Sequence, residues 1–183
     1  MGFRPRRLES EDELYDCAVA ILARRMRTIA ELKRLLGGRV DSTTEIGEAL
    51  VALVIRRLKD QGYVDDAKYA AAYSSFRRDN EKFGRRRVAA DLKTKGVHRE
   101  IIDKTLDSAF HEVDEEKQAR AFLRRKRVKK PRNQVEAARI SRQLVRAGFG
   151  GQTIFRVLGK WGIEITEMAE EETFEERGGN LED

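Results

Sequence analysis

Side chains that could support acid–base or metal chemistry are few and scattered along the 183 residues of this chain. Asp65 and Asp66 are its only adjacent aspartates and could hold a metal ion, but they directly follow Gly62-Tyr63-Val64. A glycine followed by an apolar residue is typical of a helix end, so we expect Asp65 to cap the next helix instead. The only histidines, His98 and His111, stand in no cysteine or carboxylate pattern typical of a zinc site. The sequence thus predicts no catalytic residue, no metal and no cofactor.

Basic side chains, in contrast, gather in short runs, and such runs bind phosphate groups or acidic protein surfaces. Cations near a helix C-terminus also offset the helix dipole, which is the structural alternative for the run that begins at Arg24. That alternative does not fit Arg85–Arg87, because we expect them to open a helix, where positive charge is unfavourable. Nor does an ordinary solvated face explain six basic residues in the seven positions 124–130. The predicted binding residues are Arg24, Arg25, Arg27, Arg85, Arg86, Arg87, Arg124, Arg125, Lys126, Arg127, Lys129 and Lys130.

The net charge of +6 conceals an asymmetry between the body of the chain and its end. Residues 164–183 contain nine acidic residues and one basic residue, a net charge of −8. Residues 1–163 contain 37 basic and 23 acidic residues, a net charge of +14, which favours a polyanionic partner. Because the end has few apolar residues, we expect a disordered acidic tail. This tail either competes with phosphates for the basic body or is inert.

The elements that carry these charges follow a repeated pattern. Five positions recur at a separation of 52 residues without a gap, and in each copy an apolar helical segment stops at a glycine before a second helical segment begins. A partial third copy lies upstream, where Gly37 and Gly38 follow a leucine-rich segment and roughly residues 40–47 are extra. A unit repeated at a fixed period indicates an array of small modules rather than one thick core. The two full copies are Leu92, Gly96, Val97, Ile102 and Leu106, and Leu144, Gly148, Phe149, Ile154 and Leu158.

The fold predicted from these patterns is all-α, because only two prolines interrupt the chain and no long stretch alternates apolar and polar residues as a strand does. We expect the first helix over 11–27. Further helix starts are marked by capping boxes, in which a polar side chain and a glutamate three residues later satisfy free amide groups. These boxes begin at Thr28, Ser42 and Asn133.

The predicted helices group into three triplets, each of which buries a small core. Expected core positions in the third and fourth helices include Ile46, Leu53, Ala72 and Phe76, and near the end of the last helix Phe155 and Trp161. The expected division is a basic N-terminal arm over 1–10, repeats over 11–62, 63–112 and 113–163, and the acidic tail over 164–183.

The cellular setting is indicated by what the sequence lacks. The lone cysteine, Cys17, excludes an internal disulfide framework. No apolar run approaches membrane-spanning length, and no charged-then-apolar leader opens the chain. We therefore expect a cytoplasmic protein without a membrane partner.

Three stretches of the chain match motifs of one known family. Residues 22–32, LARRMRTIAEL, form an Arg-rich helix end followed by a small polar residue and Glu-Leu. Residues 58–70, LKDQGYVDDAKYA, place a helix end at glycine before two apolar residues, Asp-Asp and an aromatic-Ala pair. Gly84-Arg85 and LKTKGV at 92–97 form the third motif. Over about residues 14–162, the chain resembles the RecX family, the bacterial regulators of the RecA recombinase. It departs from that family in the extra residues near 40–47 and in the acidic tail.

The resemblance implies three tandem three-helix, helix-turn-helix-like repeats in an elongated, curved array. It also implies binding to RecA, in the groove or at the end of the RecA filament on single-stranded DNA. The expected effect is inhibition of ATP hydrolysis, strand exchange and co-protease activity, within homologous recombination, DNA repair and the SOS response. On this basis the twelve basic residues contact RecA or, weakly, single-stranded DNA, and the protein is a monomer and not an enzyme.

Two other functions stay open on the sequence. One is a stand-alone DNA-binding protein of helix-turn-helix type, such as a transcription factor. The other is an enzyme such as a nuclease, which is the weakest reading because metal-assisted phosphoryl chemistry needs clustered carboxylates and the acidic residues here are dispersed. A RecX-type regulator differs from the first alternative in suppressing RecA's DNA-dependent ATPase well below the concentration that saturates DNA.

Overall fold

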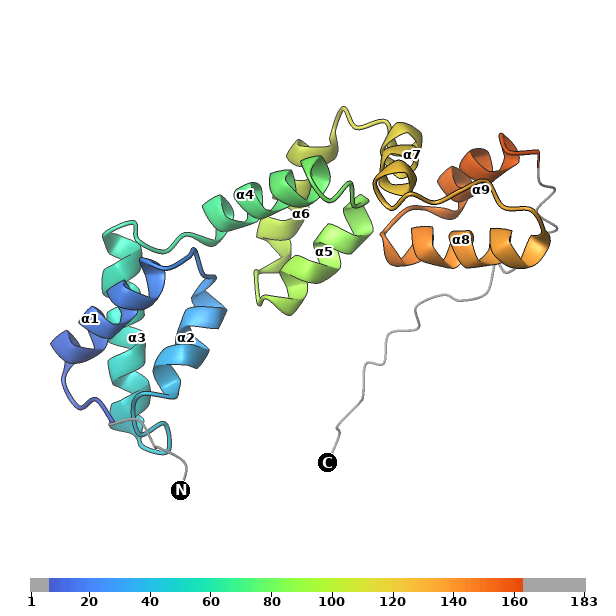
Figure 1. Cartoon of the computed structure of the whole chain (residues 1–183). Coiled ribbons are helices and arrows are strands. Elements are labelled where there is room, and N and C mark those ends of the chain that lie inside the picture. Colours follow the sequence, from blue (N-terminus) through green and yellow to red (C-terminus); the bar gives the residue numbers. More distant parts are fainter. Residues whose placement is uncertain (1–6, 163–183) are drawn as a thin grey trace, which may run out of the picture.

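The computed structural model describes residues 7–162, and every regular element in that range is an α-helix (Figure 1). The predicted acidic tail and most of the basic N-terminal arm lie outside the described residues. No helix within 7–162 has both the length and the apolar character needed to cross a bilayer. The helices are α1 (Glu11–Leu22), α2 (Ile29–Gly37), α3 (Glu45–Asp60), α4 (Asp66–Asp79), α5 (Arg85–Thr94), α6 (Arg99–Phe110), α7 (Glu115–Arg125), α8 (Gln134–Arg146) and α9 (Gly151–Gly159).

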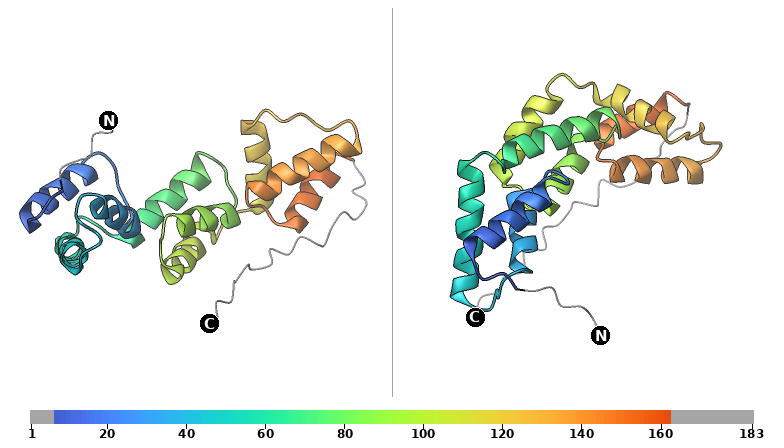
Figure 2. Two further views of the ribbon diagram at one scale, coloured as in Figure 1. Left: turned by 90° about the horizontal axis from the view of Figure 1, so that it is seen from below. Right: turned by 60° about the vertical axis from the view of Figure 1, so that its left-hand side comes forward.

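The helices pack in three consecutive triplets, each around its own apolar core. The middle helix of each triplet contributes a fully buried leucine, namely Leu32, Leu92 and Leu144. The triplets follow one another along an arc, so the molecule is elongated and curved (Figures 1 and 2). We propose that these three cores correspond to the repeats at 11–62, 63–112 and 113–163.

The repeated glycines end helices by one shared backbone turn. Gly62, Gly96 and Gly148 have φ angles of 74°, 77° and 89°, a left-handed conformation that glycine adopts without strain. The amide of the next residue then bonds to a carbonyl in the last helical turn, as Val97 N does with Leu92 O at 3.1 Å. The 52-residue correspondence in the sequence therefore marks the same turn in the second and third triplets.

Three of the predicted caps are confirmed. Asp65 Oδ1 accepts a hydrogen bond from Ala67 N at 2.8 Å at the start of α4. Thr28 Oγ1 accepts a hydrogen bond from Glu31 N at 3.0 Å at the start of α2. Asn133 Oδ1 accepts one from Glu136 N at 2.9 Å at the start of α8. Each cap satisfies an amide group that has no partner within its helix.

Two predicted helix limits are wrong. The cap of α3 is Thr44 rather than Ser42, because a turn closed by Thr44 N and Asp41 O at 3.2 Å delays the helix by two residues. The first helix ends at Leu22 rather than at residue 27, because the chain must turn before Thr28 to bring α2 back against α1. Its terminal arginines consequently lie in a turn and not on a helix.

Several predicted core positions are also wrong, because the side chains lie in solvent. In α3, packing against both α1 and α2 turns the buried stripe to Val51, Ile55 and Leu58. Trp161, as expected, packs on the third core. The exposed positions are Ile46, Leu53, Ala72, Phe76 and Phe155.

The first and second triplets meet where the N-terminus of α2 abuts the C-terminus of α5. Thr28 Oγ1 donates to Lys95 O at 2.7 Å, and Lys95 Nζ pairs with Glu31 at 3.0 Å. Asp66 adds a second link by accepting a hydrogen bond from Ile29 N at 2.9 Å. The positive end of one helix dipole thus faces the negative end of the other, which is favourable.

The second and third triplets meet in the same way, with the N-terminus of α5 on the C-terminus of α8. Gly84 N donates to Ala147 O at 2.9 Å. Phe83 packs on both the second and the third core, with its ring centroid 5.9 Å from that of Phe122. The middle helices α2, α5 and α8 therefore run head to tail along the array.

Because Asp66 is buried at the junction of the first and second triplets, we expect its substitution to change the stability of the protein in a pH-dependent way. Burial raises the pKa of its carboxyl group, so the folded state binds a proton more tightly than the unfolded state does. The stabilising contribution of this group is complete at low pH and is lost as the pH rises through the folded-state pKa. Asp66→Asn, which keeps an oxygen for Ile29 N, should therefore be more stable than the parent at pH 7, and the gain should shrink towards acid pH.

Urea unfolding at neutral and acid pH measures this difference. Asp65→Asn is the matched control, because it removes the same charge from the same helix start at a residue that is more exposed. An equal gain for Asp66→Asn at both pH values would contradict the expected role of burial.

Candidate nucleic-acid interface

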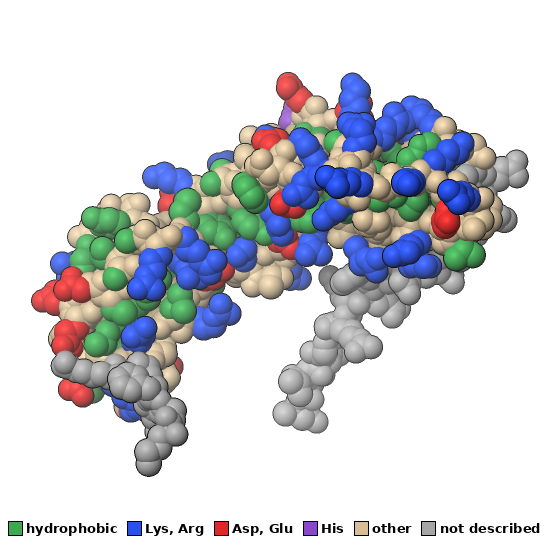
Figure 3. All heavy atoms as spheres, in the orientation of Figure 1, with side chains coloured by type: hydrophobic (Ala, Val, Ile, Leu, Met, Phe, Trp, Pro, Cys, Tyr) green, Lys and Arg blue, Asp and Glu red, His purple; other side chains and the backbone are tan. Residues whose placement is uncertain are grey.

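The positive charge of the body is concentrated in its third triplet. Residues 113–163 contain fourteen basic and four acidic residues, a net charge of +10. Residues 11–62 contain nine of each kind, and residues 63–112 contain eleven basic and nine acidic residues. Basic side chains gather over α7, α8 and α9, whereas acidic ones are prominent near α1 (Figure 3). A polyanion would therefore meet its strongest attraction at this end of the arc.

The basic run after α7 is displayed by a strained turn. Arg127 has a φ angle of 53°, and the turn is closed by Val128 N on Leu123 O at 3.0 Å. Non-glycine residues in this conformation cost about 1 kcal/mol or more. The turn buries part of Val128 on the third core and leaves the basic side chains around it outside.

The basic residues of this run differ in whether their side chains contact other parts of the protein. Arg125 is held by Glu81 at 2.8 Å, and Lys126 lies over the ring of Phe122 at 5.9 Å. The other four are exposed and form no ion pair with another described residue. These are Arg124, Arg127, Lys129 and Lys130.

The arginines that open α5 have a structural explanation that sequence reasoning missed. Because α5 begins at the C-terminus of α8, their charge lies beside the negative end of the α8 dipole. Arg85 also pairs with Asp107 at 2.6 Å, and Arg87 with Asp91 at 3.0 Å. Arg86 is exposed and has no ion pair within residues 7–162. Binding of a partner by these three residues stays a prediction.

Asp91 also organises other charged groups next to this junction. It accepts hydrogen bonds from Tyr73 Oη at 3.0 Å and from Arg77 at 2.7 Å. Burial, followed by the bond to Asp91, raises the pKa of the Tyr73 hydroxyl, which stays protonated and donates. Arg77 and Arg87 are thereby tied to the second core.

The arginines between α1 and α2 are of two kinds. Arg24 and Arg25 are exposed and form no ion pair with another described residue. Arg27 is only 19% exposed and lies 4.0 Å from Glu31, the residue that also binds Lys95 across the junction. Arg27 thus contributes to the junction, whereas a binding role for Arg24 and Arg25 stays a prediction.

One set of basic residues escaped the sequence analysis. Arg139, Arg142 and Arg146 are exposed on α8 and form no ion pair with another described residue. Their spacing of three and four positions puts them on one face of the helix, opposite the buried face that contains Leu144. Helical periodicity applied to charge would have found this arginine stripe, as we call these three residues, whereas a search for contiguous runs did not.

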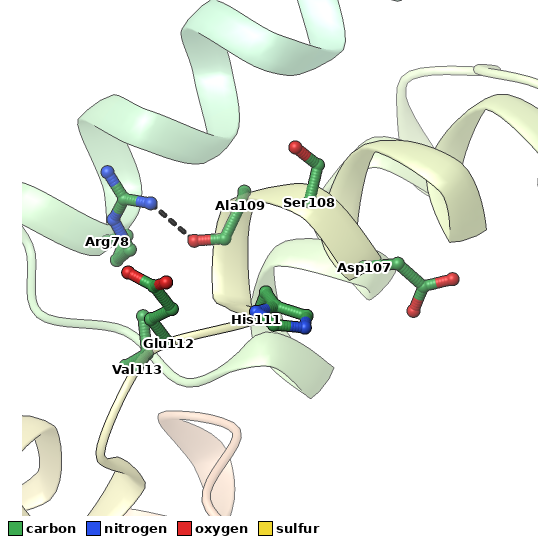
Figure 4. A pocket seen from close by; sticks show the side chains of 7 residues that line it. All are labelled: Arg78, Asp107, Ser108, Ala109, His111, Glu112 and Val113. Atoms are coloured by element: carbon green, nitrogen blue, oxygen red, sulfur yellow. Dashed lines mark hydrogen bonds between the residues drawn. The ribbon is translucent and has the colours of Figure 1, made fainter.

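A hollow of about 610 Å³ lies at the C-terminal end of α6. Its lining includes Asp107, Ser108 and His111, but Asp107 points away towards solvent and pairs with Arg85 (Figure 4). No hydrogen bond joins these three side chains, and Arg78 instead donates to the carbonyl of Ala109. Within residues 7–162, no cluster of His, Cys, Asp and Glu is arranged to hold a metal ion.

Comparison with known proteins gives the family. The sequence profile of "RecX, second three-helix domain" matches residues 65–106, which cover α4, α5 and most of α6. The chain is 34% identical to "Regulatory protein RecX" of Myxococcus xanthus, over 80% of this chain and 83% of that protein. It is 32% identical to the protein of the same name from Mycolicibacterium vanbaalenii, over 75% and 76%. The chain belongs to the RecX family of regulatory proteins.

Solved structures of RecX proteins share the fold. The crystal structure of RecX from Lactobacillus salivarius superposes with a TM-score of 0.61 over 83% of this chain and 96% of that chain, at 19% identity. A second crystal structure, of a regulatory protein RecX, gives a TM-score of 0.63 over 82% and 71%, at 22% identity. The all-α prediction of tandem three-helix repeats is confirmed.

Proposed function

We propose that this RecX protein regulates the RecA recombinase, mainly as an inhibitor. It binds the RecA filament on single-stranded DNA and suppresses ATP hydrolysis, strand exchange and co-protease activity in the bacterial cytoplasm. The observation that carries the proposal is membership of a family of regulatory proteins, with relatives of that name aligned over three quarters or more of the chain.

Two features of the structure support a filament as the target. The array is curved and elongated, which suits contact with several units of a long polymer (Figure 2). Its charge is concentrated at one end, so the third triplet can face DNA while the neutral first triplet faces protein. In this proposal the protein acts as a monomer by binding, without a chemical step of its own.

Suppression of RecA's ATPase tests the proposal. We expect ATP hydrolysis on a single-stranded circle to fall at concentrations of this protein far below those that saturate the DNA. Pre-assembled filaments and filaments assembled in its presence should both respond. ATPase activity that falls only once naked DNA is saturated would contradict a direct action on the filament.

The second candidate is a stand-alone helix-turn-helix DNA-binding protein. It is favoured by one observation, that α8 and α9 form a helix–turn–helix whose outer faces carry unpaired arginines within the described residues. Such a protein would suppress RecA only by competing for DNA. The same titration therefore separates the two candidates.

A further inference from the structure

The outer face of α8 carries three arginines at helical spacing. Arg139 is followed by Arg142 three positions later, and Arg142 by Arg146 four positions later. Like charges at these spacings destabilise a helix by about 0.2–0.5 kcal/mol per pair. On α3 and α6, in contrast, exposed arginines meet an aspartate four positions later. The arginine stripe thus has repulsion where these two arginines on α3 and α6 have a compensating aspartate.

We propose that the arginine stripe binds the phosphodiester backbone of a nucleic acid. Phosphates would supply the acidic partners that α8 does not offer Arg142 and Arg146 at three or four positions, and arginine is suited to them because its planar guanidinium donates two parallel hydrogen bonds. From Arg139 to Arg146 the helix rises about 10 Å, at 1.5 Å per residue. This matches about three phosphate-to-phosphate steps of one strand of a duplex, at 3.4 Å each along the axis.

The stripe continues across the junction with the second triplet. Arg146 directly precedes Ala147, whose carbonyl oxygen accepts the hydrogen bond from Gly84 N. Arg86, exposed and without an ion pair in the described part of the chain, lies two residues beyond Gly84. A strand that leaves α8 at its C-terminus therefore meets a further cation at the start of α5.

Reversal of the central charge separates binding from stability. Arg142→Glu places a carboxylate between Arg139 and Arg146 and turns both repulsive pairs into attractive ones. We expect α8 to be at least as stable as before, and thermal unfolding of the whole protein to be unchanged or shifted upward. The dissociation constant for DNA should rise roughly tenfold or more at low salt, because a phosphate contact becomes a repulsion. Arg139→Gln with Arg146→Gln should also weaken binding, without any new negative charge.

Fluorescence anisotropy with a labelled oligonucleotide, single-stranded in one arm and duplex in the other, measures the effect over a range of salt concentrations. Arg34→Glu is the matched control, because Arg34 is exposed on α2 without an ion pair among residues 7–162 and lies in the neutral triplet. Its effect on affinity should be about twofold or less. The arm that responds more strongly identifies which form of DNA the stripe contacts.

This inference rests on the proposed function and deepens it. Because the anisotropy measurement contains no RecA, DNA binding by the stripe and regulation of RecA can fail separately. Equal affinities of Arg142→Glu and Arg34→Glu for both DNAs would overturn it. Loss of RecA suppression in Arg142→Glu with unchanged affinity for DNA would also overturn it, and would assign the stripe to an acidic protein surface. If Arg142→Glu weakens DNA binding and also loses helical content, the stripe maintains the fold of α8 rather than contacting phosphates.

Discussion

Gly148→Ala is expected to destabilise the protein by about 3–5 kcal/mol, the sum of backbone strain and a steric clash. Gly148 has a φ angle of 89°, which L-residues resist. A Cβ atom there would also lie 2.2 Å from the backbone nitrogen of Arg87, so the start of α5 would have to move. That movement breaks the hydrogen bond from Gly84 N to Ala147 O and disturbs Phe83 between the two cores.

Gly62→Ala is the matched control for this prediction. Gly62 has a similar φ angle of 74°, but a Cβ atom there meets no atom within 4 Å. Its cost should be the backbone strain alone, about 1 kcal/mol. Urea unfolding measures both values, and hydrogen exchange at Gly84 and Val88 reports whether the junction opens. Equal costs for the two substitutions would mean that the junction adapts to the extra atom.

The local structure could be predicted from the sequence wherever the signal is local. The glycine turns at Gly96 and Gly148 follow from the backbone freedom of glycine and from the apolar residue after each one. The caps at Thr28 and Asn133 follow from side chains that reach an amide three residues away. Each of these features is decided within one turn of helix.

Features that depend on a neighbouring helix could not be predicted in this way. Which side of α3 is buried depends on how α1 and α2 lie against it, so the apolar pattern places Leu53 in the core although it is 48% exposed. The electrostatic setting of Arg85–Arg87 depends on the C-terminus of α8, which is about sixty residues away in the sequence. A helix start that is unfavourable for cations in isolation thus becomes favourable in the array.

Only part of the candidate site can be predicted from the sequence, because the contacts of each cation depend on neighbouring helices. A contiguous run such as 124–130 is visible without knowledge of the fold, but its free members can be separated from Arg125 only once Glu81 is placed beside it. The arginine stripe on α8 shows the opposite case, because its residues are spaced in sequence and adjacent in space. Contiguity in sequence is thus a poor guide to which cations a helical surface offers.

Neutralising the four free basic residues after α7 is expected to weaken binding to single-stranded DNA on the order of a hundredfold at about 0.1 M salt. Each phosphate contact on a single strand contributes about 0.7 to the slope of log K against log salt concentration, so loss of all four contacts flattens the slope by about 3. Folding should be retained, because these side chains hold no ion pair with another described residue. The substitutions are Arg124→Gln, Arg127→Gln, Lys129→Gln and Lys130→Gln.

A control with the same loss of charge tests whether position matters or only net charge. Four exposed basic residues outside the third triplet serve this purpose, since they also lack ion pairs in the described part of the chain. They are Lys33, Arg34, Arg39 and Lys104, each replaced by glutamine. If the run after α7 contacts phosphates, the slope of log K against log salt concentration becomes flatter in the variant of residues 124–130. In the control variant it stays near that of the parent protein. Equal slopes in the two variants would mean that the DNA responds to the overall field of the molecule, and the strained turn at Arg127 would then serve no contact with phosphates.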